Sequence, residues 1–422
     1  MVNSPASSLF SPALPAPCFV VDAPRLRANC AVLDRVQRES SARILLALKA
    51  FATFATFPLL SRAMGTGPLH GTCASSVHEA RLGREHFGGE VHAFAAAFNE
   101  AEISELLPLV DHITFNSVGQ WRRFAPQIAA YNKTVAAGGP ADGADGGTIG
   151  ASPVTCGLRI NPEHSEGATP IYDPCSPGSR LGIRLRHFDP AVFDEGITGL
   201  HSHTLCEQNA DALERTLAAV ERKFGPHLRR CQWYNMGGGH HITREDYDVE
   251  LLIRLVRQWR QRYGVTVYLE PGEAVALNAG WLTATVMDVV EADMPIAILD
   301  ASAACHMPDV LEMPYTPPLW YRNNGGALVQ ADRDTPETQP CRCRFAGKSC
   351  LAGDVIGDYG LDHIPAIGER LVFGDMAIYT MVKTNTFNGL QLPAIGMLDG
   401  DSIGDFRLIR SFGYEDFRMR LS

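Results

Sequence analysis

The sequence predicts an α/β protein, a parallel (β/α)8 TIM-like barrel joined to a C-terminal, mainly antiparallel β domain. Short apolar runs of strand length alternate eight times with amphipathic helical patterns before residue 271. After that residue, strand-like runs are separated by turn signals and carry little helix. A chain of 422 residues has room for a barrel of about 250 residues and a second domain.

The elements follow in order along the chain. The apolar run Cys18–Val21 comes first, and Asp22 and Pro24 then mark a helix start. The eight predicted barrel strands begin with Ile44–Leu48 and end with Val265–Leu269. Between them lie 68–72, Val91–Phe94, His112–Phe115, Thr155–Ile160, Ile197–His201 and Gln232–Asn235.

The domain boundaries follow from this alternation. Residues 24–270 are expected to form the barrel, and 14–23 together with 271–422 the β domain. The strand-like runs expected in the β domain are Leu282–Val290, Ile296–Leu299, Arg370–Phe373, Ala377–Val382 and Ser402–Leu408.

Three segments lie outside this pattern. Residues 1–13 are rich in Ser, Ala and Pro, and we expect them to be disordered, as chain ends often are. Residues 136–152, rich in Gly and Ala, read as a flexible surface insertion. Residues 323–340 are a second polar, turn-rich segment.

Composition narrows the class of protein. A net charge of −10 argues against nucleic acid and anionic membrane surfaces as partners and is compatible with a cationic ligand. The eleven cysteines show no secreted framework, which indicates reduced thiols in a cytoplasmic protein. The N-terminal stretch has no basic start and no apolar core, so neither a signal peptide nor a transmembrane segment is expected there.

Chemistry-bearing residues fall at the carboxyl ends of the predicted strands, where barrel enzymes place their working groups. Lys49 follows the first strand and Glu270 follows the eighth. The fifth, sixth and seventh strands carry or precede Arg159, His201, His203 and the run Gly237-Gly238-Gly239.

Lys49 has two interpretations. Taken alone, its segment favours an ordinary surface lysine at a strand end. If Phe51 and Phe54 wall the amine, desolvation disfavours the ammonium form, as a Schiff-base lysine requires.

The triple glycine suits backbone amides that wrap closely around a phosphate, although many glycine runs are only turns. Its position after the seventh strand favours the phosphate site. With Lys49 for an aldehyde, His203 to stack on a ring and Glu270 to keep a pyridine nitrogen protonated, the set describes a pyridoxal 5'-phosphate site. A protonated ring is a strong electron sink, which favours decarboxylation.

A metal site is the alternative for the histidines and for part of the cysteines. No C-x-x-C pair and no helical H-x-x-x-H or H-E-x-x-H spacing accompanies them, so we assign no metal. The residues concerned are His201, His203, His240, His241, Cys341, Cys343 and Cys350.

Longer motifs resemble the fold-type III (alanine racemase-like) pyridoxal phosphate decarboxylases, which include the ornithine and diaminopimelate enzymes. Within that family the similarity is greatest to the carboxynorspermidine/carboxyspermidine decarboxylases, and it spans nearly the whole chain. The motifs include ALKAFATF (47–54), GLRINPEHSE (157–166), NMGGGHHITREDYDVELL (235–252), YLEPGEAVALNAG (268–280), LDASAACHMPDVLEMPY (299–315), CLAGDVIGDY (350–359) and DMAIYTMVKTNTFNG (375–389).

This resemblance implies further roles. Tyr379 would reach the phosphate, and Cys350 would donate a proton to the carbanion across the interface of a homodimer. Ornithine decarboxylase-type sites carry arginine where this chain has Glu273, and an extra carboxylate suits a polyammonium substrate. Asp309 and Asp300 are further substrate-binding candidates, although for each acid alone a structural ion pair or a solvated position stays open.

The expected function is therefore decarboxylation of carboxynorspermidine, carboxyspermidine or both, a step in polyamine biosynthesis. Diaminopimelate or ornithine decarboxylation is the nearest alternative. A racemase is disfavoured because alanine racemases of this fold set an arginine, not a glutamate, against the pyridine nitrogen. A non-catalytic regulatory relative is disfavoured because Lys49, Glu270 and Cys350 are all present.

Overall fold

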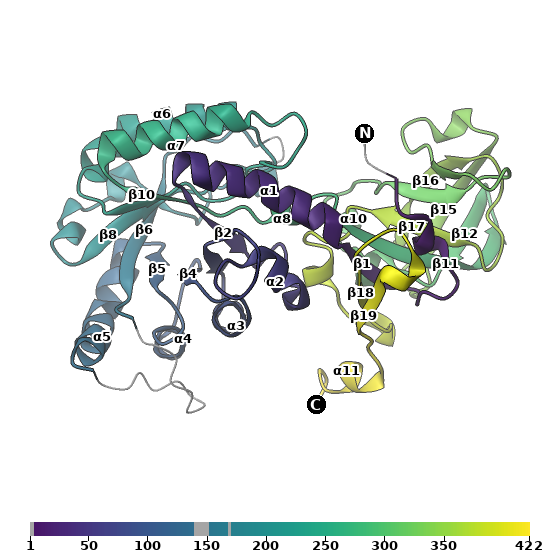
Figure 1. Ribbon diagram of the computed structural model, residues 1–422, viewed down its shortest axis with the longest axis horizontal. Helices are drawn as coiled ribbons and strands as arrows, with labels where there is room; N and C mark the ends of the chain where they lie inside the picture. The colour runs from purple at the N-terminus through teal and green to yellow at the C-terminus, as the bar shows by residue number, and fades with distance from the viewer. Residues whose placement is uncertain (1–3, 139–151, 168–169) are drawn as a thin grey trace. The chain divides into compact units, whose positions relative to one another are not determined.

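The computed structural model describes residues 4–138, 152–167 and 170–422, and the chain divides into two compact units. The barrel unit comprises Arg27–Val275, and the β unit comprises Met1–Leu26 and Ala276–Ser422. Figure 1 shows the parallel strands of the first and the larger mixed sheet of the second.

The barrel unit is built on parallel strands in the order β5-β4-β3-β2-β10-β9-β8-β6, and pairing of β5 with β6 closes the ring. The predicted (β/α)8 fold is confirmed. Its strands are β2 (Arg43–Ala47), β3 (Gly71–Ala74), β4 (Glu90–Phe94), β5 (His112–Phe115), β6 (Thr155–Asn161), β8 (Ile197–His201), β9 (Trp233–Asn235) and β10 (Thr266–Leu269), with the short β7 (Ile183–Arg184) beside β6.

Helices between the strands begin at polar residues whose side chains cap the first turn. Ser76, Asn99, Ser117 and Asp248 each accept a hydrogen bond from the N–H three residues further on. The α-helices that lie wholly or mostly in the barrel unit are α1 (Ala23–Ser40), α2 (Phe57–Leu60), α3 (Val77–Leu82), α4 (Glu100–Leu106), α5 (Val118–Ala136), α6 (Ala210–Leu228), α7 (Val249–Tyr263) and α8 (Glu273–Ala276).

One predicted strand is displaced. The run at 68–72 becomes β3, which starts at Gly71, while Leu69 forms an isolated bridge with Ser61. A Cβ at Gly71 would lie 1.9 Å from the Glu90 carbonyl oxygen, so glycine permits the close approach of β3 to β4.

The β unit is a single mixed sheet with the path β14-β13-β17-β11-β1-β18-β19, to which β12, β15 and β16 are added. Its described pairings are antiparallel except β1 with β18 and β12 with β15. The strands are β1 (Cys18–Asp22), β11 (Gly280–Glu291), β12 (Pro295–Leu299), β13 (Leu319–Arg322), β14 (Leu328–Gln330), β15 (Cys341–Gly347), β16 (Val355–Leu361), β17 (Arg370–Gly374), β18 (Ala394–Leu398) and β19 (Phe406–Arg410). The short helices are α9 (Ala303–His306), α10 (Asp309–Glu312) and α11 (Tyr414–Arg418).

Two strand predictions in this unit need correction. Ala377–Val382 forms no strand, because Asp375 and Tyr379 both have positive φ and turn the chain. Ser402–Leu408 is a strand only from Phe406 onward, after a 3-10 turn.

The N-terminal segment also differs from expectation. Residues 4–13, predicted to be disordered, contain a 3-10 helix at Ser7–Phe10. Leu9 and Phe10 are buried in a cluster with Trp281 and Trp320, so burial of these apolar side chains holds the segment on the β unit.

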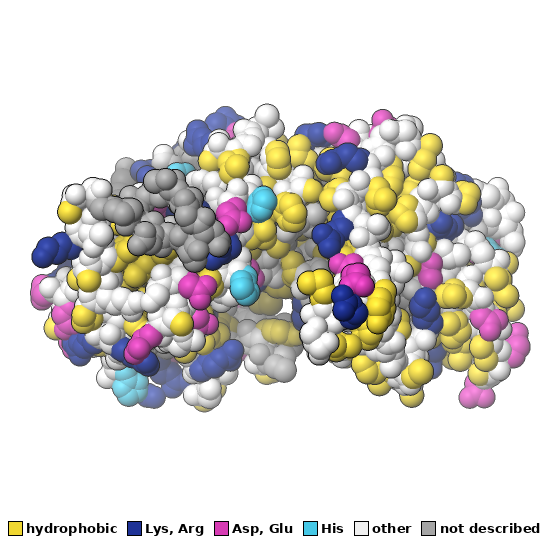
Figure 2. All heavy atoms as spheres, turned by 90° about the horizontal axis from the view of Figure 1, so that it is seen from below, with side chains coloured by type: hydrophobic (Ala, Val, Ile, Leu, Met, Phe, Trp, Pro, Cys, Tyr) yellow, Lys and Arg dark blue, Asp and Glu magenta, His cyan; other side chains and the backbone are white. Residues whose placement is uncertain are grey.

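The other interrupting segments have different outcomes. Most of the predicted insertion at 136–152 lies outside the described residues. The segment 323–340 is turn-rich as predicted and also contains β14 and a 3-10 turn at Pro336–Thr338. Among the described helices, none has the length and hydropathy required to cross a bilayer. On the face seen in Figure 2, acidic and basic side chains are interspersed.

Candidate active site

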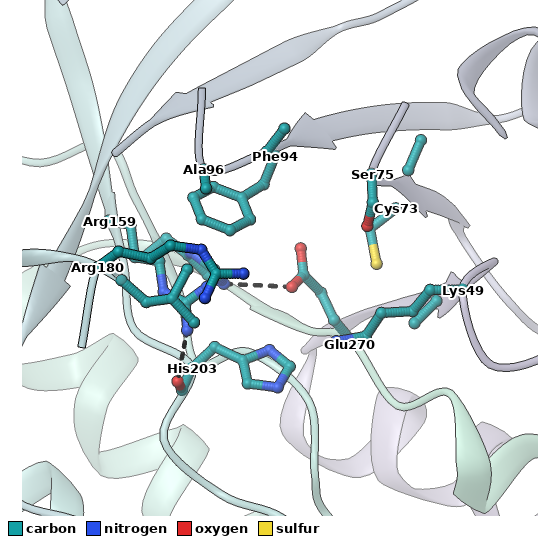
Figure 3. Close-up of a pocket in the computed structure, with 14 residues that line it drawn as sticks. Lys49, Cys73, Ser75, Phe94, Ala96, Arg159, Arg180, His203 and Glu270 are labelled. Carbon is teal, nitrogen blue, oxygen red and sulfur yellow. Dashed lines mark hydrogen bonds and ion pairs between the residues drawn. The ribbon is translucent and has the colours of Figure 1, made fainter. Parts of the chain in front are cut away.

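A cavity of about 270 Å³ opens at the carboxyl ends of the barrel strands (Figure 3). The predicted residues Lys49, Arg159, His203 and Glu270 all line it. The remaining lining residues are Ala47, Cys73, Ala74, Ser75, Phe94, Ala95, Ala96, Arg180, Leu181 and His201. The barrel topology therefore brings together residues that are more than 200 positions apart in the sequence.

Lys49 lies two residues beyond β2, in a turn in which the Ala50 N–H donates to the Ala47 carbonyl over 3.0 Å. The side chain is exposed. The predicted desolvation of the amine is wrong, because Lys49 is exposed and neither Phe51 nor Phe54 lines the cavity. Phe51 is buried, and Phe54 packs on His86.

Glu270 is a buried carboxylate that the site keeps ionised. The Asn235 amide donates to its Oε1 over 2.6 Å, and His201 Nε2 lies 3.2 Å from its Oε2. Burial by itself raises the pKa of Glu270, but the facing His201 and the Asn235 hydrogen bond outweigh it and lower that pKa to about 2. At neutral pH Glu270 is therefore able to hold a proton on a facing heterocyclic nitrogen.

Arg159 positions the wall opposite Lys49. The residue is 5% exposed, and its guanidinium donates to the His203 carbonyl over 2.9 Å and lies 4.7 Å from the centroid of the Phe94 ring. Burial lowers its pKa to about 10, which leaves the group charged at neutral pH. Arg159 thus fixes the start of the segment that carries His203.

His203 offers a flat, neutral ring to the cavity. Its Nδ1 accepts a 3.2 Å hydrogen bond from the Gly238 N–H, which assigns the ring proton to Nε2. Burial holds the pKa of His203 well below its usual value, so the ring stays uncharged. A neutral imidazole fixed in this way suits stacking on an aromatic ring.

In the glycine run after β9, the backbone conformation and close packing require glycine even without a ligand. Gly237 and Gly239 have φ of +73° and +79°, and a Cβ at Gly239 would lie 1.9 Å from the Leu205 carbonyl oxygen. The Gly237 N–H donates to Asn235 Oδ1 over 2.8 Å. The Gly239 N–H donates to no residue that the structure describes, and it remains free for an anion.

Glu273 begins α8 and belongs to a small acidic group beside this loop. Its Oε2 lies 3.1 Å from His241 Nε2, and the carboxylate of Glu207 is close to both. Burial raises the pKa of Glu207, and the Glu273 charge raises it further. None of these three residues lines the cavity described above.

The other predicted site residues belong to the β unit. Cys350 is exposed in the turn before β16, where its N–H donates to Asn388 Oδ1 over 2.7 Å. Tyr379 is partly buried and has φ of +51°. Two predicted substrate acids already have partners, since Asp309 is paired with Lys383 and Asp300 accepts the Thr285 N–H over 2.8 Å.

Potential metal ligands gather in three places within the described part of the chain, and no cysteine belongs to any of them. One group is His201, His203 and Glu270 in the cavity, and another is Glu207, His241 and Glu273. The third, Glu90, His92 and His112, lies where β4 and β5 begin, at the barrel end away from the cavity.

Sequence reasoning missed several cavity residues. Cys73, Ser75 and Phe94 lie in or just after β3 and β4, and a rule that examines the end of every strand would have found them. Asn235, the donor to Glu270, is the last residue of β9, so the same rule would have found it. Arg180 lies in a loop, within the stretch YDPCSPGSRLGI (172–183); that stretch contributes to the family resemblance, but the resemblance gave Arg180 no role.

This barrel, with a lysine, an ionised carboxylate and a glycine loop at its strand ends, defines the class of barrel-type pyridoxal phosphate enzymes. The chain belongs to the pyridoxal-dependent decarboxylase family, whose model, described as the C-terminal sheet domain, matches residues 18–377.

Two relatives and one solved structure show how far the similarity extends. Carboxyaminopropylagmatine decarboxylase of Synechocystis is 42% identical over 97% of this chain and 96% of its own. Carboxynorspermidine/carboxyspermidine decarboxylase of Campylobacter jejuni is 38% identical over 98% of this chain and 100% of its own. The crystal structure of carboxynorspermidine decarboxylase from Campylobacter jejuni, complexed with norspermidine, has a TM-score of 0.79 at 36% identity and covers 96% of this chain and 100% of that one.

These comparisons confirm the predicted decarboxylase family and its pyridoxal phosphate cofactor. Three cavity residues fit that cofactor, because an amine, an ionised buried carboxylate and a neutral imidazole correspond to its aldehyde, ring nitrogen and ring face. The free amide of Gly239, in the loop after β9, corresponds to its phosphate.

Proposed function

We propose that this chain removes the carboxylate of a carboxylated polyamine, namely carboxynorspermidine, carboxyspermidine or both. The observation that carries the proposal is full-length similarity to relatives of that name, together with the norspermidine-bound structure of one of them. The chain's net charge of −10 agrees with a polycationic product.

Carboxyaminopropylagmatine is the second candidate substrate, because the Synechocystis relative is 42% identical over nearly the whole chain. The agmatine part of this substrate carries a guanidinium where the other two substrates carry an ammonium group. The two candidates therefore differ at the end of the substrate that does not react.

Within this proposal, different residues bind different parts of the cofactor. Lys49 holds it covalently, Glu270 keeps a proton on the ring nitrogen, and His203 packs against the ring. The Gly239 amide and the hydroxyl of Tyr379 would bind the phosphate, and the Gly238 amide would join them only by giving up its hydrogen bond to His203 Nδ1. The bound cofactor supplies the electron sink for the pair that remains when carbon dioxide leaves.

Arg159 supports the reaction without touching the substrate, through its hydrogen bond to the His203 carbonyl. We assign the return of a proton to the substrate carbon to the thiol of Cys350. We also infer a homodimer in which each protomer lends Cys350 to its partner's site. Eleven unpaired cysteines support a reducing, cytoplasmic location.

Glu273, Asp309 and Asp300 are the proposed partners of the substrate's ammonium groups. Glu273 is the best supported, because it lies beside the glycine loop and its one ion pair among the described residues is with a histidine. Asp309 can bind the substrate only if the substrate displaces Lys383. Asp300 would have to bind the substrate while it still accepts the hydrogen bond from the Thr285 N–H.

The test is carbon dioxide release by the purified chain supplied with pyridoxal phosphate. The substrates are carboxynorspermidine, carboxyspermidine, carboxyaminopropylagmatine, ornithine and diaminopimelate. The proposal expects the highest kcat/KM for one of the first two. A highest value for carboxyaminopropylagmatine would select the second candidate, and one for ornithine or diaminopimelate would refute both.

A further inference from the structure

Arg180 lines the cavity on a rigidly held backbone. It lies in the loop between β6 and β7, where Asn116 Nδ2 donates to its carbonyl oxygen over 2.7 Å. The Gly182 N–H donates to Asn116 Oδ1 over 2.7 Å, so Asn116 fixes both sides of Leu181. The position of Arg180 at the cavity is therefore built into the fold of the loop.

The guanidinium of Arg180 is exposed and makes no ion pair or side-chain hydrogen bond with any residue that the structure describes. Figure 3 shows it alongside Arg159, on the side of the cavity opposite Lys49. Arg159 is already committed to the His203 carbonyl and to the Phe94 ring. Arg180 is thus the guanidinium on this wall that is left for a ligand.

The charge of the cavity also favours an anion. Three cationic side chains line it, Lys49, Arg159 and Arg180, and Glu270 is the single carboxylate among its lining residues. Two guanidinium groups side by side repel each other, and the Arg180 charge contributes to the lowered pKa of Arg159. An incoming carboxylate would relieve this repulsion, and the planar guanidinium is suited to binding one through two parallel hydrogen bonds.

Two anions enter such a site, the cofactor phosphate and the substrate carboxylate. The glycine loop assigned to the phosphate does not contribute to the cavity wall that carries Arg180. We propose that Arg180 binds the carboxylate that the substrate loses, so that it selects the carboxylated substrate over the decarboxylated amine. This inference rests on the proposed function for the identity of the substrate.

The reaction gives this contact a particular kinetic role. The bond between the substrate carbon and its carboxylate breaks, the electron pair stays on the substrate side, and the carboxylate leaves as neutral carbon dioxide. Its attraction to Arg180 is full in the bound substrate and fades as the bond breaks. Arg180 therefore tightens substrate binding without lowering the barrier from the bound state, and it adds nothing to the binding of the product.

The experiment compares Arg180→Gln with the wild-type holoenzyme, using Arg180→Lys as the conservative variant. Loss of one charge-assisted pair is expected to raise KM about 10- to 100-fold. Because the lost contact is stronger in the bound substrate than in the transition state, we expect kcat not to fall, and we expect the inhibition constant of the matching decarboxylated amine to stay the same. Arg180→Lys should recover part of the KM. Arg186→Gln, in the same segment but outside the cavity, is the matched control and should behave as wild type.

Three results would overturn the proposal. They are an unchanged KM in Arg180→Gln, an equal loss of affinity for substrate and amine product, and loss of the bound cofactor, which would assign Arg180 to the phosphate. If the wild-type enzyme releases carbon dioxide from none of the candidates, the proposed function fails. Equilibrium binding of carboxynorspermidine and norspermidine to the two proteins then decides on Arg180, because only the carboxylated ligand should lose affinity.

Discussion

Asn235 joins the glycine loop to the buried acid of the site. Its amide donates to Glu270 Oε1 over 2.6 Å, while its own oxygen accepts the Gly237 N–H over 2.8 Å. One side chain at the end of β9 therefore sets both the orientation of the carboxylate and the start of the loop. This coupling predicts that binding of the cofactor ring by Glu270 and binding of its phosphate by the glycine loop depend on each other.

Replacing Asn235 by alanine should weaken both functions together. A buried carboxylate loses a donor, at a cost of about 1.5–3 kcal/mol, and the loop loses the acceptor of its first amide. We expect at least 10-fold weaker binding of pyridoxal phosphate and a lower kcat, measured by cofactor titration and by carbon dioxide release. Asn235→Asp keeps an acceptor for the Gly237 N–H but sets a second carboxylate against Glu270, so it should restore the loop contact and not kcat. Full cofactor affinity in both variants would contradict the coupling.

Glu90, at the opposite end of the barrel, should make stability depend on pH. Its carboxylate accepts from Arg43 over 2.6 Å and from Tyr268 over 2.8 Å. Burial raises its pKa, but the surrounding hydrogen bonds, with His70 and His92 first, bring it far below the ordinary 4.5. A carboxyl whose pKa is lower in the folded state stabilises fully above pH 4.5, and this contribution is lost as the pH falls below that value.

The measurement is the unfolding free energy of wild type and Glu90→Gln between pH 3 and pH 7. We expect the variant to be less stable by about 2 kcal/mol at pH 7 and the difference to shrink in acid. Glu100→Gln, at a surface position, is the control and should change stability by less than about 0.5 kcal/mol. A difference that does not vary with pH would contradict the assignment.

Glu273 should matter for substrate class. If it attracts an ammonium group of the polyamine, Glu273→Arg replaces attraction with repulsion, and kcat/KM for the carboxylated polyamine should fall more than 10-fold. The fall for ornithine should be smaller because that molecule is shorter and carries fewer charges. Glu273→Gln should lie between wild type and Glu273→Arg. Equal losses on both substrates would assign Glu273 to the fold of the loop.

Cys350 should be needed for the final proton transfer. Cys350→Ala is expected to lower kcat about 100-fold, within the range for loss of a general acid, with little change in KM. Cys341→Ala, at a partly buried strand position, should leave kcat close to wild type. Mixing Cys350→Ala with Lys49→Ala protein should restore up to a quarter of the wild-type activity if the thiol acts across the interface of a dimer. Absence of restoration would refute a donor from the partner.

The sequence predicted the barrel because strand and helix periods alternate clearly, and Lys49 and Glu270 followed from the rule on strand ends. It did not predict contacts made across long chain separations, such as Asp309 with Lys383 or Asn235 with Glu270. It also misjudged the surroundings of Lys49, because the exposure of a side chain after a strand depends on how the chain turns there. The 3-10 helix at Ser7–Phe10 was missed because two or three apolar side chains are too few to show a helical period.

The central claim is that Lys49 carries the cofactor. Borohydride reduction of the holoenzyme followed by peptide mass spectrometry tests it directly, because reduction makes the link between lysine and cofactor permanent. The account predicts the added mass on the peptide that contains Lys49, and neither added mass nor turnover in Lys49→Ala. Modification of Lys133, Lys223, Lys348 or Lys383 instead, or carbon dioxide release by Lys49→Ala, would contradict it.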